Sequence, residues 1–188
     1  MAHGLWYALK VRPRFEGMVA GSLSYKGYDL FLPTYKSKRH WSDRTKVLDL
    51  PLFPGYLFCR FDLQTRLPIL TTPGVNSIVG AGRSPQAVDE SEIEAIRTVV
   101  QSGVAYEPYA YLPVGQLVRV EDGALSGLTG IVTDHKNDSR LIISVSLLMR
   151  SVSVEIDRSS LKLAGNAPRR RFVIPDAAVM TSAIAPSL

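Results

Sequence analysis

Pro51-Leu-Phe-Pro-Gly-Tyr-Leu-Phe58 is followed, further along the chain, by a second signature, Val118-Arg-Val-Glu-Asp-Gly123 with Gly127 and Gly130. The first stretch predicts a turn-bounded strand, because Pro-Gly favours a turn and the large apolar residues favour an extended backbone. The second is typical of the opening of a small β-barrel. Neither carries catalytic chemistry, so together they indicate a binding protein.

Composition and charge narrow the class of protein. The 188 residues are 46% hydrophobic, which is enough to pack one ordinary domain or two small ones. A net charge of +5 and a pI near 9.4 favour an anionic partner such as nucleic acid, provided that the excess is local. No stretch approaches the roughly 18 apolar residues of a membrane span, and we expect a cytoplasmic protein without a membrane partner.

Cys59 is the only cysteine, which excludes an intrachain disulfide and favours a reducing compartment. Its apolar neighbours indicate a small buried strand residue instead of a nucleophile.

The amino-terminal half alternates strand and helix signals. Residues 5–12 predict a strand that Pro13 ends, and apolar residues from Phe15 to Leu23 predict a helix that Gly27 closes. Strands follow at 28–33 and within 48–61. A second helix begins at an Asp89 N-cap, with Glu92 as its capping partner; Ile93, Ile96 and Val100 form its buried stripe and Gly103 its stop.

The carboxy-terminal half predicts short strands at 117–120, 130–133, 141–147 and 152–156, with a hairpin turn at Asn137-Asp138. We therefore expect an α+β protein with an amino-terminal domain over 1–104, a linker over 105–113, a small β-barrel over 114–163 and a disordered tail over 164–188. The tail contains Arg169-Arg-Arg171, for which a solvated charge run is favoured over a nucleic-acid contact.

The residues do not predict an enzyme, a cofactor or a metal site. The sequence contains no phosphate-binding glycine loop and no Cys or His pair at metal-ligand spacing. The acidic residues near Asp89 are explained as first-turn residues that the helix dipole favours.

Residues 36–46 hold five of the 22 Lys and Arg residues in a segment that we expect to be a loop. Lys and Arg neutralise phosphates, and Trp41 could stack on an unpaired base. A solvated hairpin with Trp41 folded onto the core explains the same residues equally well. The candidate nucleic-acid-binding residues are Arg12, Lys36, Lys38, Arg39, His40, Trp41, Arg44 and Lys46.

Tyr56 and Phe58 lie two residues apart on a predicted strand, so they point to the same face. Periodicity alone favours a core position for this face, with a contact surface as the alternative.

The chain resembles the NusG family of transcription elongation factors over residues 5–163. The likeness rests on Trp6-Tyr7, Phe15-Glu16, the block from Pro51 to Tyr56, Gly74-Val75 with Val79-Gly80, and the barrel entry at Asp122-Gly123. Residues His40 to Arg44 further resemble the specialised antiterminator branch called UpxY, which is related in role to RfaH.

The resemblance implies an amino-terminal NGN-type α/β sandwich with an antiparallel sheet, and a carboxy-terminal KOW barrel of the SH3-like kind. The amino domain would bind the clamp helices of RNA polymerase through Tyr56 and Phe58 and suppress pausing and termination. Its basic side would face upstream or nontemplate DNA. The barrel would recruit a small-subunit ribosomal protein or Rho through Leu125 and Leu128, and the protein would be a monomer.

Two other functions stay open at this point. A translation-linked RNA-binding protein would use the barrel as its RNA module, but it leaves the Pro-Gly-Tyr block without a purpose. A general NusG that serves all genes differs from the specialised type only in selectivity.

Overall fold

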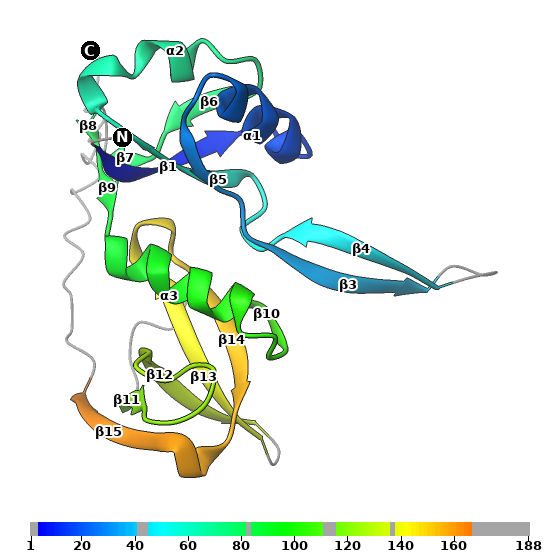
Figure 1. The fold of residues 1–188 in the computed structure, drawn as a ribbon, viewed down its shortest axis with the longest axis vertical. Helices are drawn as coiled ribbons and strands as arrows, with labels where there is room; N and C mark the ends of the chain where they lie inside the picture. The colour runs from blue at the N-terminus through cyan, green and yellow to red at the C-terminus, as the bar shows by residue number, and fades with distance from the viewer. Residues whose placement is uncertain (1–3, 41–44, 82–83, 111–115, 136–137, 167–188) are drawn as a thin grey trace, which may run out of the picture.

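The computed structural model describes residues 4–40, 45–81, 84–110, 116–135 and 138–166 (Figure 1). It confirms a mixed fold of mostly antiparallel sheets with few helices. An amino module and a barrel module lie at opposite ends of the long axis. Within the described part of the chain, no helix is long and apolar enough to cross a membrane.

The amino module is built on a sheet in the order β2-β5-β1-β6. The central strand β1 (Leu5–Val11) pairs antiparallel with β5 (Tyr56–Phe61), and β2 (Asp29–Phe31) lies beyond β5. On its other side β1 pairs with β6 (Val75–Ile78) and β9 (Ala87–Val88). A small ladder joins β7 (Gly80–Ala81) to β8 (Ser84–Pro85).

This sheet separates two hydrophobic clusters because side chains alternate along each strand. Tyr7, Leu9 and Leu57 pack on the face covered by α1 (Glu16–Tyr25) and α2 (Leu67–Leu70), the second of which follows the short 3-10 helix η1 (Leu63–Thr65). Trp6, Ala8 and Phe58 pack on the opposite face. Along β1 and β5, the even-numbered side chains therefore lie on one face of the sheet and the odd-numbered side chains on the other.

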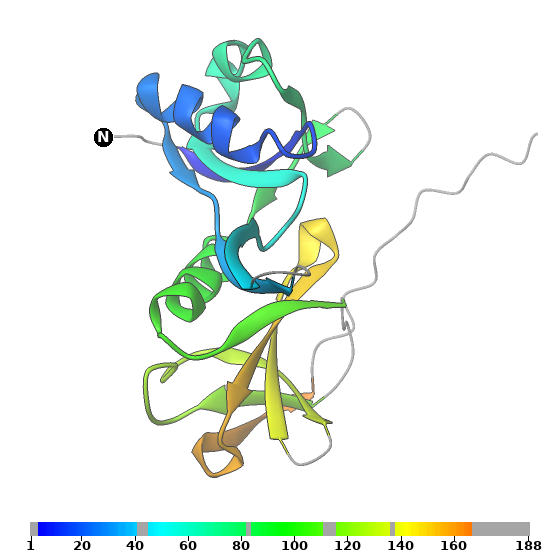
Figure 2. The same ribbon diagram turned by 90° about the vertical axis from the view of Figure 1, so that its right-hand side faces the viewer.

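Helix α3 (Glu90–Gln101) covers this second face and lies between the sheet and the barrel in both views (Figures 1 and 2). Asp89 caps it, as predicted, by accepting a hydrogen bond from the Ser91 amide at 2.9 Å. Ile93 and Ile96 are buried, as predicted, together with Val99. Because these three side chains belong to a cluster that also holds residues of the barrel, α3 buries its apolar side against both modules.

Helix α3 contacts both modules through polar side chains as well. The Arg97 guanidinium lies 5.6 Å from the Trp6 ring of the sheet. Five residues earlier, the Glu92 carboxylate accepts a hydrogen bond from the Ser146 amide of the barrel at 3.2 Å. Five residues correspond to a rotation of about 140° around a helix, so the two contacts leave from different sides.

The barrel sheet has the order β10-β14-β13-β12-β11-β15. Its buried side chains include Val118, Leu141, Val152 and Val154, which join the same cluster as Trp6 and Phe58. The strands are β10 (Tyr106–Ala110), β11 (Gln116–Val120), β12 (Thr129–His135), β13 (Asp138–Val145), β14 (Arg150–Ile156) and β15 (Leu161–Asn166), with short 3-10 helices η2 (Ser146–Leu148) and η3 (Arg158–Ser160).

Two boundaries differ from the predictions. Residues 106–110 of the predicted linker form β10, which pairs with β14 from Tyr106↔Val154 to Ala110↔Arg150. Pro108 obscures the strand in the sequence, yet an edge strand tolerates its missing N–H. The barrel also continues to Asn166, three residues beyond the predicted end. The prediction stopped at Leu163 because a register shift in the β11–β15 pairing breaks the alternation of side chains there. Residues 111–113 and 167–188 lie outside the described residues, as does Asn137 of the predicted turn.

Candidate functional site

The Pro-Leu-Phe-Pro-Gly-Tyr block forms a turn that is fixed to the start of the amino module. Gly55 has a φ of +83°, in the left-handed region that favours glycine. Its amide donates to the buried Glu16 carboxylate at 2.8 Å, and its carbonyl accepts from the Val11 amide at 2.8 Å. The turn therefore holds the end of β1, the first residue of α1 and the start of β5 together.

Tyr56 and Phe58 point to one face of β5, as predicted, since both belong to the cluster under α3. Phe58 is 0% exposed and packs edge-on against Phe53 at 5.7 Å between ring centroids, with Phe31 at 6.1 Å. Tyr56 is half-buried at the rim. Phe58 therefore takes the core position that periodicity favours, and the open contact surface that the resemblance implies is corrected for this side chain.

The Arg97 side chain of α3 packs over the aromatic face of the amino module, which consists of Trp6, Phe31, Phe53 and Phe58 with Tyr56 at its rim. Its guanidinium lies 5.2 Å from the Phe31 ring as well as near Trp6, and it also pairs with Glu94 at 2.8 Å. Arg60 lies on Trp6 at 6.0 Å. Helical periodicity did not identify Arg97, because a charged residue in a helix predicts a solvated face.

The basic segment belongs to a hairpin, the alternative to a loop, which we call the arm: strands β3 (Thr34–His40) and β4 (Thr45–Pro51). Figure 1 shows the arm projecting sideways from the junction of the two modules. Lys36 and Lys46 are exposed on it. The register places Lys38, Arg39 and His40 opposite Val47, Lys46 and Thr45, whereas Trp41 and Arg44 lie outside the described residues.

The root of the arm is anchored to both modules. The Leu52 amide donates to the Pro33 carbonyl at 2.8 Å, and both residues are buried. The Tyr106 hydroxyl, from β10, donates to the Thr34 carbonyl at 2.7 Å. Burial, and then the nearby Asp49 carboxylate, raises the pKa of Tyr106, so the hydroxyl keeps the proton that it donates.

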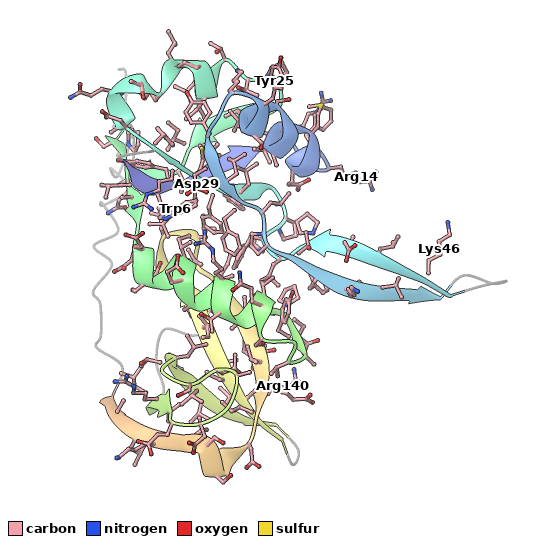
Figure 3. All side chains as sticks on the ribbon, viewed as in Figure 1. Trp6, Arg14, Tyr25, Asp29, Lys46 and Arg140 are labelled. Atoms are coloured by element: carbon pink, nitrogen blue, oxygen red, sulfur yellow. The ribbon has the colours of Figure 1, made fainter. Side chains whose placement is uncertain are left out.

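Two exposed arginines lie where β1 turns into α1. Arg12, a predicted nucleic-acid-binding residue, is exposed with its guanidinium 5.0 Å from the Phe15 ring. Arg14, which sequence reasoning missed, has a φ of +68°. Figure 3 shows Arg14 and Lys46 on the side of the molecule from which the arm projects. The sequence gives no signal for the left-handed backbone of Arg14, because that conformation belongs to the chain reversal between β1 and α1.

The predicted partner-binding residues of the barrel are less exposed than expected. Leu125 is 4% exposed and belongs to the core, and Leu128 is half-buried against the same cluster. A direct contact by Leu125 is therefore corrected to a packing role in this structure.

For the described part of the chain, the sequence predicts no metal site and no reactive cysteine. Among those residues, no group of three or more His, Cys, Asp or Glu side chains could hold a metal ion. Cys59 is buried, and burial, followed by the charge of Asp29, raises its pKa to about 12. Its thiol stays protonated at neutral pH, which confirms the interpretation of a packed strand residue.

Comparisons with known proteins agree with this arrangement. A family model described as "Transcription termination factor nusG" matches residues 4–97, which is half of the 188-residue chain. The chain is 31% identical to the "Transcription termination/antitermination protein NusG" of Helicobacter pylori strain J99 over 116 residues, covering 60% of this chain and 66% of that protein. The protein of the same name in Escherichia coli K12 is 29% identical over 174 residues, covering 85% of this chain and 96% of that protein.

The fold has a solved counterpart, described as "Domain interaction in Thermotoga maritima NusG". The superposition has a TM-score of 0.51 at 17% identity and covers 87% of this chain and 98% of that one. At this identity the likeness concerns the fold alone. It includes both modules, as the coverage requires.

Proposed function

This chain belongs to the NusG family of transcription termination and antitermination proteins, and from that membership we propose that it is an elongation factor that binds RNA polymerase and suppresses pausing and termination. The observation that carries the proposal is the family match on residues 4–97, which contains the Pro-Gly-Tyr turn and its aromatic cluster. The RNA-binding alternative assigns no function to residues 4–97.

The polymerase contact that we propose is the aromatic face of the amino module, with Tyr56 at its rim and Phe58 beneath. Its ligand would be the pair of clamp helices, which an aromatic face would hold through apolar contacts. Because Phe58 is buried with Phe31 and Phe53, it supports the surface from within, and Tyr56 makes the direct contact.

Pull-down of core RNA polymerase tests this proposal. Tyr56→Ala removes the rim side chain, and we expect captured polymerase to fall by tenfold or more, as for a buried aromatic anchor worth about 2 kcal/mol. Tyr25→Ala is the matched control, because Tyr25 is 95% exposed at the end of α1 and outside the cluster. Equal capture by wild type and Tyr56→Ala would contradict the proposed contact.

Phe58→Ala is informative only with a test of folding. Removing a fully buried Phe costs about 3–5 kcal/mol of stability, so lost capture could reflect unfolding. Phe58→Leu keeps most of the apolar volume and is the variant that we would compare first. Its circular dichroism and melting temperature establish whether the fold is retained.

The nucleic-acid contact that we propose is made by Arg12 and the arm. Lys36, Lys38, Arg39, Arg44 and Lys46 supply phosphate-neutralising charge, and His40 and Trp41 are candidates for base contacts. Upstream or nontemplate DNA at the transcription bubble would be the ligand. Loss of charge in the arm should weaken DNA binding and reduce its salt dependence.

The barrel is proposed to recruit a second factor, either a small-subunit ribosomal protein or Rho. Leu128 is the half-buried candidate at its surface, whereas Leu125 supports the loop from within. Pull-down of each purified protein by wild type and by Leu128→Ala separates the two partners.

Selectivity remains a proposal of its own: His40 to Arg44 suggests the specialised UpxY type, which acts on one operon. Mapping the chromosomal occupancy of the protein tests it. Occupancy confined to one long operon would support the specialised role, and occupancy of most transcribed genes would identify a general factor.

A further inference from the structure

The arm has the form of a ribbon that is open to a ligand on both faces. Among the described residues, β3 and β4 pair only with each other. Along β4, Lys46 is exposed, Val47 is 56% exposed and Leu48 is 37% exposed, so neighbouring positions on opposite faces are both accessible. A lone hairpin is only marginally stable in water. The arm is held here by its buried root at Pro33 and Leu52.

The register brings cations together on this ribbon. Arg39 is the direct cross-strand partner of Lys46, and like charges at directly opposed positions destabilise an antiparallel pair. The barrel has a similar pair, Arg119↔Lys162, but there Glu121 lies 3.2 Å from the Lys162 amine. Lys36 instead lies opposite Asp49, so the two described strands carry four Lys and Arg residues against one acid. This excess of positive charge on an exposed ribbon favours an anionic ligand.

The dimensions of the arm fit one nucleic-acid surface. Each strand has seven residues, so the ribbon is about 23 Å long at about 3.3 Å per residue. The major groove of B-DNA is about 12 Å wide and admits a two-stranded ribbon, whereas the minor groove, about 6 Å wide, does not. The deep, narrow major groove of duplex RNA also excludes it.

The aromatic residues of the arm bear on single-strand binding, because unpaired bases stack on exposed aromatic side chains. Tyr35 is half-buried against the core cluster at the root, and Trp41 lies outside the described residues. The shape of the ribbon is therefore what favours a duplex, and the single strand is the competing ligand in the test. Lysines on both strands suit the phosphates on the two walls of a groove.

We propose that the arm inserts into the major groove of double-stranded DNA, with Lys36 on β3 and Lys46 on β4 contacting the phosphates of opposite walls. The inference refines the nucleic-acid part of the proposed function: it names duplex DNA as the ligand and the ribbon as the reading element. It is tested on DNA without polymerase, so its failure is separate from a failure to capture polymerase.

The test measures binding of the full chain to a fluorescent random-sequence duplex, its single strand and the matching RNA duplex at several salt concentrations. We expect the DNA duplex to bind most tightly. Lys36→Ala/Lys46→Ala should weaken duplex binding and reduce the slope of log K against log salt by about 2, because two phosphate contacts are lost. Arg119→Ala/Lys162→Ala is the control of equal charge change on the barrel, and it should leave the slope within experimental error.

The groove is identified with modified DNA and a competitor. Glucosylated 5-hydroxymethylcytosines fill the major groove and should weaken binding at least tenfold, whereas netropsin, which fills the minor groove, should not compete. Tighter binding to the single strand or to duplex RNA would overturn the proposal. So would competition by netropsin, or equal salt slopes for the arm variant and the barrel control.

Discussion

Glycine and aromatic residues decide the local geometry of the amino module. Gly55 allows the left-handed turn that brings the Glu16 carboxylate to its amide, and Phe58 then enters the core beside Phe53. The sequence predicts the turn and the common face of Tyr56 and Phe58. Periodicity favours a core position for this face over a contact surface, and the packing of α3 decides between the two by burying Phe58.

Gly74 should be intolerant of a side chain. Its φ is +94°, and a Cβ would lie 2.9 Å from Val19 Cγ2 and 3.3 Å from Phe15 Cδ1. We expect Gly74→Ala to lower the free energy of unfolding by roughly 1–3 kcal/mol, from backbone strain and crowding together. Urea denaturation measures the loss.

Gly21→Ala is the matched control for this substitution. Gly21 lies inside α1, and a Cβ there meets nothing within 4 Å. Alanine favours a helix by about 0.5–1 kcal/mol over glycine, so this variant should be more stable than wild type. A Gly74→Ala variant as stable as Gly21→Ala would contradict the crowding at Gly74.

Cys59 gives a prediction for pH dependence. Its pKa is raised to about 12 in the folded state from an ordinary value of 9.0, so the folded chain binds one more proton than the unfolded chain between these values. Stability is therefore retained below about pH 9 and lost as pH rises toward 12, by up to about 1.4 kcal/mol per pH unit. The difference in unfolding free energy between wild type and Cys59→Ala, measured across this range, isolates the effect. A difference independent of pH would contradict it.

At the scale of elements, β10 turns a connecting segment into part of the barrel. Besides its pairing with β14, its Glu107 forms an ion pair with Arg140 of β13, and Tyr106 reaches the root of the arm. The sequence of this segment shows tyrosines and prolines without periodicity. Its strand exists because the edge of β14 is available to pair with it.

Removing the ion pair should loosen β10 selectively. The pair is partly exposed and contributes up to about 1 kcal/mol, so Arg140→Met should raise amide hydrogen exchange in β10 up to about fivefold. Exchange in β1 should not change. Lys162→Met, which breaks the exposed pair with Glu121, is the control and should leave β10 protected. Equal exchange in the two variants would show that Glu107 and Arg140 do not hold the strand.

At the scale of the whole molecule, the two modules share one hydrophobic cluster. Trp6, Phe58 and Ile96 belong to the same cluster as Leu141 and Val152 of the barrel, and α3 lies between them. The predicted boundary after residue 104 therefore separates the chain by topology but not by packing. We expect the modules to unfold together.

Ile96→Ala tests this coupling, because Ile96 is fully buried in the shared cluster. It should cost about 2–5 kcal/mol and shift the urea midpoints of β1 and β13 amides by the same amount. Leu23→Ala is the second probe, since Leu23 is equally buried but belongs to the cluster on the α1 face. If the modules unfold as one cooperative unit, it should also shift the β1 and β13 midpoints by equal amounts, and a shift confined to β1 would contradict the coupling. Separate β1 and β13 transitions in wild type would contradict a shared core.

The sequence by itself determined the opening strand and helix of the amino module, the Pro-Gly-Tyr turn, the Asp89 cap and the resemblance to NusG, because each depends on neighbouring residues or on a fixed spacing. Only the tertiary structure decided that the cluster under α3 covers Phe58, that residues 34–40 and 45–51 form a projecting ribbon, and that residues 106–110 join the barrel. These features depend on which surfaces meet. Periodicity shows that a residue has an apolar side, but packing between distant segments decides what covers it.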